Sequence, residues 1–106
     1  MRYVIGRVAL RPGLRNSFIE KSAAYVAASR ADTGCVYFHV APMPDDPDGV
    51  VFIECWDTLA NHRAHSASAY AIGFRPVAEA HMLRGDFQEM TVDAAEQVSF
   101  DLSSPA

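Results

Sequence analysis

The stretch YVIGRVALRPGLRNSFIEKSAAYVAASRA, residues 3–31, decides the fold class. Its first eight residues are mostly β-branched, aromatic or otherwise apolar, as in a strand, and the turn signal Arg11-Pro12-Gly13 follows them. From Leu14 onward, apolar and small residues recur at three- and four-residue spacing, which predicts an amphipathic helix over residues 14–31. A strand that leads into such a helix is the opening of a split βαβ unit.

The rest of the chain repeats this order of elements. We predict strands over residues 35–41 and 50–56, a short helix over 59–65, a longer helix that Ser66 or Ser68 begins and Arg84-Gly85-Asp86 ends, and a last strand over 87–92. Pro76 lies inside the longer helix and removes a backbone donor, so we expect a kink or a break there. The order β-α-β-β-α-α-β predicts an α+β, ferredoxin-like fold, in which a four-stranded antiparallel sheet carries its helices on one face.

One domain accounts for most of the 106 residues. We assign residues 1–94 to this domain and residues 95–106 to a C-terminal tail. Both faces of the second and third strands are apolar, so the face without helices needs a cover, and a second copy of the chain would provide it. The alternating tail residues Val98, Phe100 and Leu102 are then expected to add to the sheet edge of that partner.

Composition argues against two classes of partner. The net charge is −4 and Lys21 is the single lysine, which argues against nucleic acid, because neutralising phosphates requires clustered positive charge. No apolar run approaches the roughly 20 residues of a membrane span, and the N-terminus lacks the pattern of a signal peptide, so we expect a cytoplasmic protein with no membrane partner. Cys35 and Cys55 lie in apolar strands, where we expect buried thiols rather than a disulfide.

Four short motifs follow one another along the chain: Leu10-Arg11-Pro12-Gly13, Ser29-Arg30 through Gly34-Cys35-Val36-Tyr37-Phe38, Glu54-Cys55-Trp56, and Ala64-His65 followed by Ser68 and Tyr70. In their order and spacing, these motifs resemble the antibiotic biosynthesis monooxygenase family. The resemblance spans roughly residues 3–92 and implies a homodimeric ferredoxin-like domain that forms a dimeric α+β barrel. Characterised enzymes of the family oxidise quinols or aromatic polyketides with O2 and use no metal or flavin. Others cleave haem, with an Asn and a Trp where this chain has Gly6 and His65, so haem cleavage is not expected.

His65 and Tyr70 are the candidate catalytic residues. Histidine titrates near neutral pH and could take a proton from a phenol or hold the resulting anion, although a histidine at a helix end can also serve only to order a turn. Tyr70 stands where the family has histidine, and it could orient a substrate oxygen or be a core tyrosine. We place Phe38, Trp56, Phe74 and Arg75 in the substrate pocket, with core packing as the competing role for Trp56.

Two further polar residues stay outside the predicted site. His62 lies three residues before His65, but no further ligand accompanies the pair, so we expect no metal and an exposed helical histidine. Glu54 lies in an apolar strand and needs a partner, for which Arg7 and Arg75 are the candidates.

These patterns together predict a cofactor-independent monooxygenase that oxidises a quinol or a polycyclic phenol with O2. One alternative is a non-catalytic dimeric module that binds a small aromatic ligand. Another is an isomerase or lyase that uses His65 without oxygen. Oxygen dependence separates the monooxygenase from the isomerase or lyase, and turnover separates both from the binding module.

Overall fold

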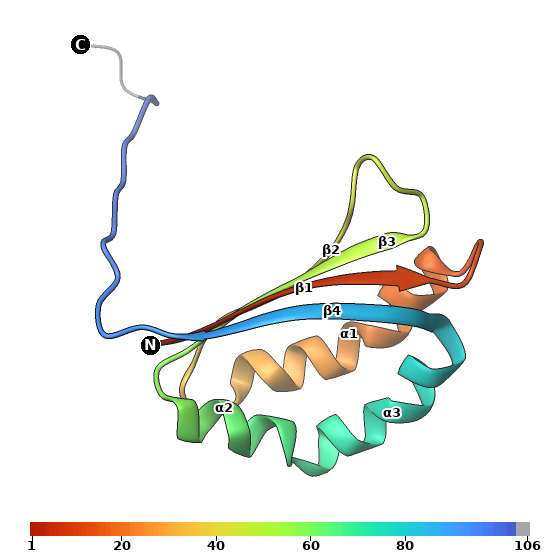
Figure 1. Ribbon diagram of the computed structural model, residues 1–106, viewed down its shortest axis with the longest axis horizontal. Coiled ribbons are helices and arrows are strands. Elements are labelled where there is room, and N and C mark those ends of the chain that lie inside the picture. Colours follow the sequence, from red (N-terminus) through yellow and green to blue (C-terminus); the bar gives the residue numbers. More distant parts are fainter. Residues whose placement is uncertain (104–106) are drawn as a thin grey trace.

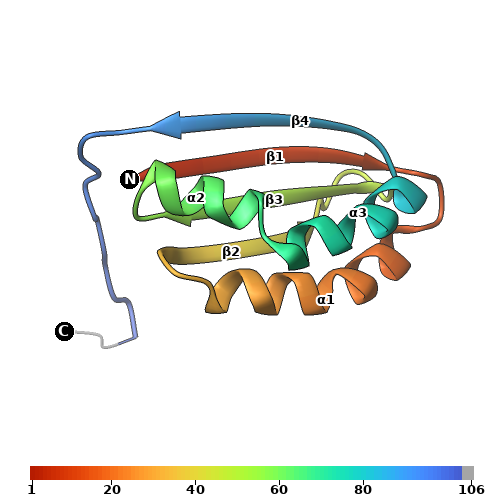
Figure 2. The same ribbon diagram turned by 90° about the horizontal axis from the view of Figure 1, so that it is seen from below.

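The computed structural model describes residues 1–103 and has the predicted order of elements (Figure 1). The strands are β1 (Arg2–Leu10), β2 (Cys35–Pro42), β3 (Gly49–Trp56) and β4 (Met82–Thr91), and the helices are α1 (Arg15–Ala31), α2 (Leu59–Ser66) and α3 (Ala69–His81). The strands form one antiparallel sheet in the order β2-β3-β1-β4. All three helices lie on the same face of this sheet (Figure 2), which confirms the predicted ferredoxin-like α+β class.

The core lies between the sheet and α1. Alternate residues of β1 and β3 point toward the helices, because successive side chains of a strand leave opposite faces. Phe18 of α1 packs against them, with its ring 6.2 Å from that of Phe52. The buried cluster consists of Val8, Leu10, Phe18, Phe38, Val50, Phe52 and Trp56.

The opposite face of the sheet is apolar and carries no described helix. Ile5 of β1 and Ile53 of β3 are paired across the two strands there, and they are 44% and 38% exposed. Tyr3 and Tyr37 lie half-buried on the same face. This surface is the one that the sequence predicts a second copy to cover.

The predicted boundary between α3 and β4 is wrong, and of the kink or break expected at Pro76 the break does not occur. The strand β4 begins at Met82, so Arg84-Gly85-Asp86 belongs to the strand rather than to a turn. Pairing with β1 explains the difference, because Gly85 lies opposite Val8 in the ladder. The helix α3 also runs unbroken through Pro76. Pro76 is exposed, while Phe74 and Val77 beside it pack against the core and hold the helix in place.

The alternation along β2 is interrupted at its start. Cys35 pairs with Trp56, but Tyr37 pairs with Cys55, so Val36 is an extra residue in a bulge. Cys35 therefore packs against the core, and Val36 is exposed. Both cysteines are free thiols, Cys55 buried and Cys35 half-buried.

The predicted C-terminal tail has no helix or strand over residues 92–103. Val98, Phe100 and Leu102 are 77%, 83% and 85% exposed, and the segment extends away from the sheet (Figure 1). Its addition to a partner's sheet stays a prediction. Residues 104–106, at the end of the predicted tail, lie outside the described residues.

Candidate functional site

Four side chains from separate parts of the chain are joined by hydrogen bonds. Tyr25 Oη of α1 lies 3.2 Å from His65 Nε2 of α2. His65 Nδ1 lies 2.7 Å from Tyr70 Oη of α3. Tyr70 Oη donates to Asp32 Oδ2, directly after α1, at 2.6 Å. We call Tyr25, His65, Tyr70 and Asp32 the relay.

Helix caps fix the two central members of the relay. The Thr58 side chain accepts from the backbone N–H of Asn61 and begins α2, as expected of an N-cap. Ser68 caps α3 by accepting from the N–H of Ala71, and its hydroxyl donates to the carbonyl oxygen of His65 at 2.6 Å. The short turn between α2 and α3 therefore sets the position of His65 relative to Tyr70.

The hydrogen bonds assign the tautomer of His65. The hydroxyl proton of Tyr70 goes to Asp32, so Tyr70 Oη can only accept from His65 Nδ1–H. A neutral His65 then has an unprotonated Nε2, which accepts from the hydroxyl of Tyr25. The hydrogen bonds of the relay therefore all run in one direction. Tyr25 donates to His65 Nε2, His65 Nδ1 donates to Tyr70, and Tyr70 donates to Asp32.

Burial keeps His65 neutral. Its ring centre lies 4.6 Å from that of Trp56 and 5.5 Å from that of Phe38, and both neighbours are fully buried. This desolvation, with a smaller contribution from His62, lowers the pKa of His65 to about 4, which the charge of Asp32 opposes. At neutral pH His65 is therefore an unprotonated hydrogen-bond acceptor, and not a base with a pKa close to 7.

The other members of the relay divide into one anion and two neutral phenols. The hydrogen bond from Tyr70 lowers the pKa of Asp32. Burial, followed by the hydrogen bond to Asp32, raises the pKa of Tyr70 to about 12. Burial also raises the pKa of Tyr25 far above its usual value, and the nearby Glu54 adds to this effect. The relay thus holds one negative charge, on Asp32, at the end remote from Tyr25.

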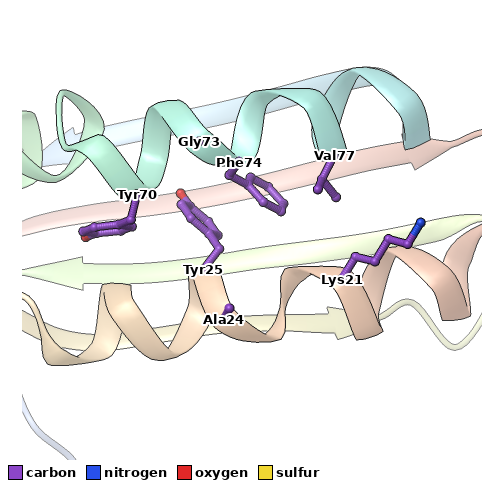
Figure 3. Close-up of a pocket in the computed structure, with 7 residues that line it drawn as sticks. All are labelled: Lys21, Ala24, Tyr25, Tyr70, Gly73, Phe74 and Val77. Atoms are coloured by element: carbon purple, nitrogen blue, oxygen red, sulfur yellow. The ribbon is translucent and has the colours of Figure 1, made fainter.

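A groove of about 210 Å³ between α1 and α3 reaches two members of the relay (Figure 3). Tyr25 and Tyr70 both line it, and the ring of Phe74 stacks on that of Tyr25 at 4.2 Å with 7° between the planes. The full lining is Lys21, Ala24, Tyr25, Tyr70, Gly73, Phe74 and Val77. Within the described residues, this groove connects the phenols of the relay with solvent.

A second polar cluster lies on the helix side of the sheet, beside Trp56. Trp56 Nε1 donates to Glu54 Oε1 at 3.0 Å, and His62 Nε2 lies 4.0 Å from the same oxygen. Arg2 Nε donates to His62 Nδ1 at 3.1 Å, and Arg2 Nη2 donates to Glu89 Oε2 at 3.3 Å. Burial raises the pKa of Glu54 to about 7, against the opposing effect of the Trp56 hydrogen bond. Burial also lowers the pKa of His62.

This cluster corrects two predictions. His62 is buried rather than exposed, because α2 turns it toward the sheet and Arg2. Glu54 does not pair with Arg7 or Arg75. Arg7 leaves the opposite face of the sheet, since it alternates with the buried Gly6 and Val8, and Arg75 is exposed on α3.

Metal-binding geometry is absent from residues 1–103. No group of three or more His, Cys, Asp or Glu side chains in this range is placed to hold an ion. In the same range, none of the helices has the length and apolar character needed to cross a membrane.

The family model described as antibiotic biosynthesis monooxygenase matches residues 1–76, which include β1 to β3, α1, α2 and the first half of α3. The chain belongs to the antibiotic biosynthesis monooxygenase family. The matched region contains all four residues of the relay. Comparison with curated protein sequences finds no significant match.

Solved structures share the fold of this family member at low sequence identity. A protein from Deinococcus radiodurans, named as an antibiotic biosynthesis monooxygenase by family resemblance, superposes with a TM-score of 0.84 at 15% identity and covers 94% of this chain and 100% of its own. A similarly named protein from Nitrosomonas europaea gives 0.80 at 19%, covering 89% and 100%. A conserved protein of unknown function from Bacteroides thetaiotaomicron, named as a possible oxidoreductase, gives 0.76 at 16%, covering 84% and 94%. At these identities the likeness concerns the fold alone.

The structure brings some of the predicted site residues together and separates others. His65 and Tyr70 are hydrogen-bonded neighbours, and Phe74 lines the groove one helical turn after Tyr70. Phe38 and Trp56 are core residues that surround His65 without lining the groove. Arg75 is exposed and does not line the groove either.

Sequence reasoning did not find Tyr25 and Asp32. Tyr25 fits the helical spacing of apolar residues in α1, and its neighbours in the sequence do not indicate a role for its hydroxyl. Asp32 carried a weak signal, because it lies within the motif from Ser29 to Phe38. An acidic residue at that position could have been tested as a partner for Tyr70 or His65.

Proposed function

We propose that this protein is a cofactor-independent monooxygenase that oxidises a phenol or quinol with O2. The observation that carries the proposal is the relay, whose two phenols line a groove and whose far end is an ionised carboxylate. Membership of a family named for monooxygenases agrees with this chemistry. The substrate enters the groove with its hydroxyl toward Tyr25.

The reaction needs no external reductant. A phenol that becomes a quinone loses two hydrogens, one from its O–H and one from the ring carbon that is oxidised. One oxygen atom of O2 becomes the new carbonyl, and the other leaves as water with those two hydrogens. All electrons come from the substrate, once deprotonation has made its ring electron-rich. The protein must therefore accept a proton, hold the ring and return the proton to the leaving oxygen.

The relay supplies a route for that proton. Tyr25 Oη can accept the substrate proton while it passes its own proton to His65 Nε2, 3.2 Å away. The imidazolium that forms is stabilised by Asp32 through the hydroxyl of Tyr70. Because the pKa of His65 is only about 4, this imidazolium is a strong acid and gives the proton back readily when the O–O bond breaks. Tyr70 and Asp32 act as positioning residues for His65.

The uncovered sheet face supports a homodimer as the active form. Ile5 and Ile53, together with Tyr3 and Tyr37, make a largely apolar surface opposite the helices. A second copy packed there would remove this surface from water. Light scattering coupled to gel filtration tests this part of the proposal, with Ile53→Glu as the variant expected to give monomers.

Oxygen uptake tests the proposed reaction. Metal-stripped protein is mixed with reduced naphthoquinones and anthrones, and the autoxidation of each substrate is subtracted. Tyr25→Phe and His65→Ala are expected to lower kcat by about 100-fold or more, the usual contribution of a proton-transfer group. Tyr3→Phe is the matched control for a lost hydroxyl, because Tyr3 lies on the other face of the sheet, and light scattering checks that this variant keeps the oligomeric state of wild type.

Two results would count against the proposal. No uptake above autoxidation with any of these substrates, together with saturable binding of one of them, would favour the non-catalytic binding module. Turnover without oxygen consumption would favour an isomerase or lyase.

A further inference from the structure

The groove between α1 and α3 has a cation at one end. Lys21 is the single lysine of the chain, and it lines the groove one helical turn before Tyr25 (Figure 3). Among residues 1–103, no carboxylate lies within ion-pair distance of its ammonium group. The relay carboxylate, Asp32, belongs to the other end of α1, beyond Tyr25. The groove is therefore positive at its Lys21 end, and no carboxylate of the described residues lines it.

Gly73 forms part of the groove wall, and packing does not explain it. Glycine in the interior of a helix is less stable than alanine, and Gly73 is the fifth residue of α3. A Cβ built at this position meets nothing within 4 Å, so no neighbour requires its absence. Its φ is not positive, so the backbone does not require glycine either. The bare backbone at Gly73 leaves the groove open on this side, as a ligand lying along α3 would require.

The volume limits what the groove can take. At about 210 Å³ it is smaller than the roughly 300–1,000 Å³ of sites that bury a drug-sized ligand. One or two aromatic rings are therefore enough to fill it. A tetracyclic ring system would leave most of its surface in water.

We propose that this groove binds one- or two-ring aromatic acids, with the carboxylate at Lys21, the ring along Gly73 and Phe74, and the opposite end at Tyr25. The inference deepens the proposed function, on which it rests for the orientation of the ring hydroxyl. It narrows the substrate class from phenols in general to small phenols with an acidic group remote from the hydroxyl. Lys21, the one charged residue among the described residues of the lining, attracts the acid to its end of the groove.

Binding under argon tests the inference without any turnover. The probes are 6-hydroxy-2-naphthoate and its neutral isostere 6-hydroxy-2-naphthamide, followed by titration calorimetry or ligand-observed NMR at low salt. Wild-type protein is expected to prefer the acid by about two- to fivefold, the range of a solvent-exposed ion pair. Lys21→Met should abolish this preference. Salt at about 0.5 M should do the same, because it shortens the Debye length to about 4 Å and so screens the exposed ion pair. Arg63→Met, which removes an exposed cation on α2, should leave it intact.

Variants at Gly73 test the site itself. Gly73→Leu should remove binding of both probes, because its side chain would fill the groove, while Gly73→Ala should weaken binding only partly. Both variants should melt no lower than wild type, since the space around a Cβ is empty and both residues favour helix. Unchanged probe binding in Gly73→Leu, or the same acid-to-amide ratio in wild type and Lys21→Met, would overturn the inference.

The outcomes separate this inference from the proposed function. Binding with the expected pattern, but no oxygen uptake with any hydroxynaphthoate, would support the site and reject the monooxygenase. Oxygen uptake with neutral quinols that is insensitive to Lys21→Met would support the monooxygenase and reject the acid-binding site.

Discussion

The buried carboxyl of Glu54 should control how stability depends on pH. Its side chain is 7% exposed, and burial raises its pKa from 4.5 to about 7. At about 1.4 kcal/mol for each unit of pKa, this rise corresponds to about 3 kcal/mol. Because the pKa is higher in the folded state, folding binds a proton between pH 4.5 and 7. Stability from this group is therefore fully present below pH 4.5 and is lost as the pH rises to 7.

His65 works in the opposite direction over nearly the same range. Its pKa falls from 6.5 to about 4 on folding, so its contribution is present above pH 6.5 and is lost as the pH falls to 4. The two effects are of similar size and opposite sign, which should leave the wild-type protein with little net dependence on these groups. Glu54→Gln removes one of them, because glutamine is neutral at every pH and can still accept from Trp56 Nε1.

Urea unfolding of wild type and Glu54→Gln at pH 4.5, 6 and 8 measures the effect. The variant should match wild type at pH 4.5 and exceed it by about 3 kcal/mol at pH 8. Its own stability should rise with pH, since the opposing effect of His65 is then unmasked. Glu79→Gln, on the exposed surface of α3, is the control and should give a constant difference near zero. If Glu54→Gln were less stable than wild type at pH 8, Glu54 would be an ionised partner of His62 and the burial argument would be refuted.

Three further predictions concern single residues. His65→Gln should unmask the opposing effect of Glu54, so that its stability rises by about 3 kcal/mol as the pH falls from 7 to 4.5 in the same unfolding series, and a stability that falls instead would mean that other groups control it. Tyr70→Phe should raise the pKa of Asp32, because its main hydrogen bond is removed, and a carboxyl-carbon NMR titration that finds no change would contradict the relay geometry. Gly34→Ala should lower the free energy of unfolding by about 1–3 kcal/mol, measured by thermal unfolding. The reason is that Gly34 has φ +81° and a Cβ there would meet Asp57 and Asn61. An unchanged stability would show that the loop relaxes.

The bounds of elements that depend on local sequence pattern were predictable, and the bounds that depend on strand pairing were not. The bounds of β1 and α1 follow from the change of period after Arg11-Pro12-Gly13, and the structure agrees within one residue. The start of β4 does not follow, because Arg84-Gly85-Asp86 reads locally as a turn. It becomes a strand only because β1 offers unpaired backbone groups at that edge. Likewise, the helix over Pro76 is retained by core contacts that the helical pattern alone does not reveal.

The candidate site divides in the same way. His65 and Tyr70 are five residues apart across one turn, so their motif could point to both. Tyr25 and Asp32 join them only because the C-terminal half of α1 packs beside α2 and α3. The low pKa of His65 was also out of reach, since it depends on two buried aromatic rings from β2 and β3. Sequence patterns pointed to His65 as a candidate but gave no indication of its protonation state.

That protonation limits the chemistry the relay can perform. Typical enzyme turnover, about 1–1,000 per second, corresponds to barriers of about 13–17 kcal/mol. Moving a proton from a phenol with a pKa near 10 to His65, with a pKa of about 4, costs about 8 kcal/mol and fits within such a barrier. At about 1.4 kcal/mol per pKa unit, proton transfer to His65 from a donor with a pKa above about 16 would by itself cost about 17 kcal/mol, the whole of such a barrier. Removal of a proton from an unactivated C–H bond, whose pKa lies far above this limit, therefore exceeds what His65 can support. Ionisation of a phenolic O–H stays within the barrier, which agrees with the phenol oxidation that we propose.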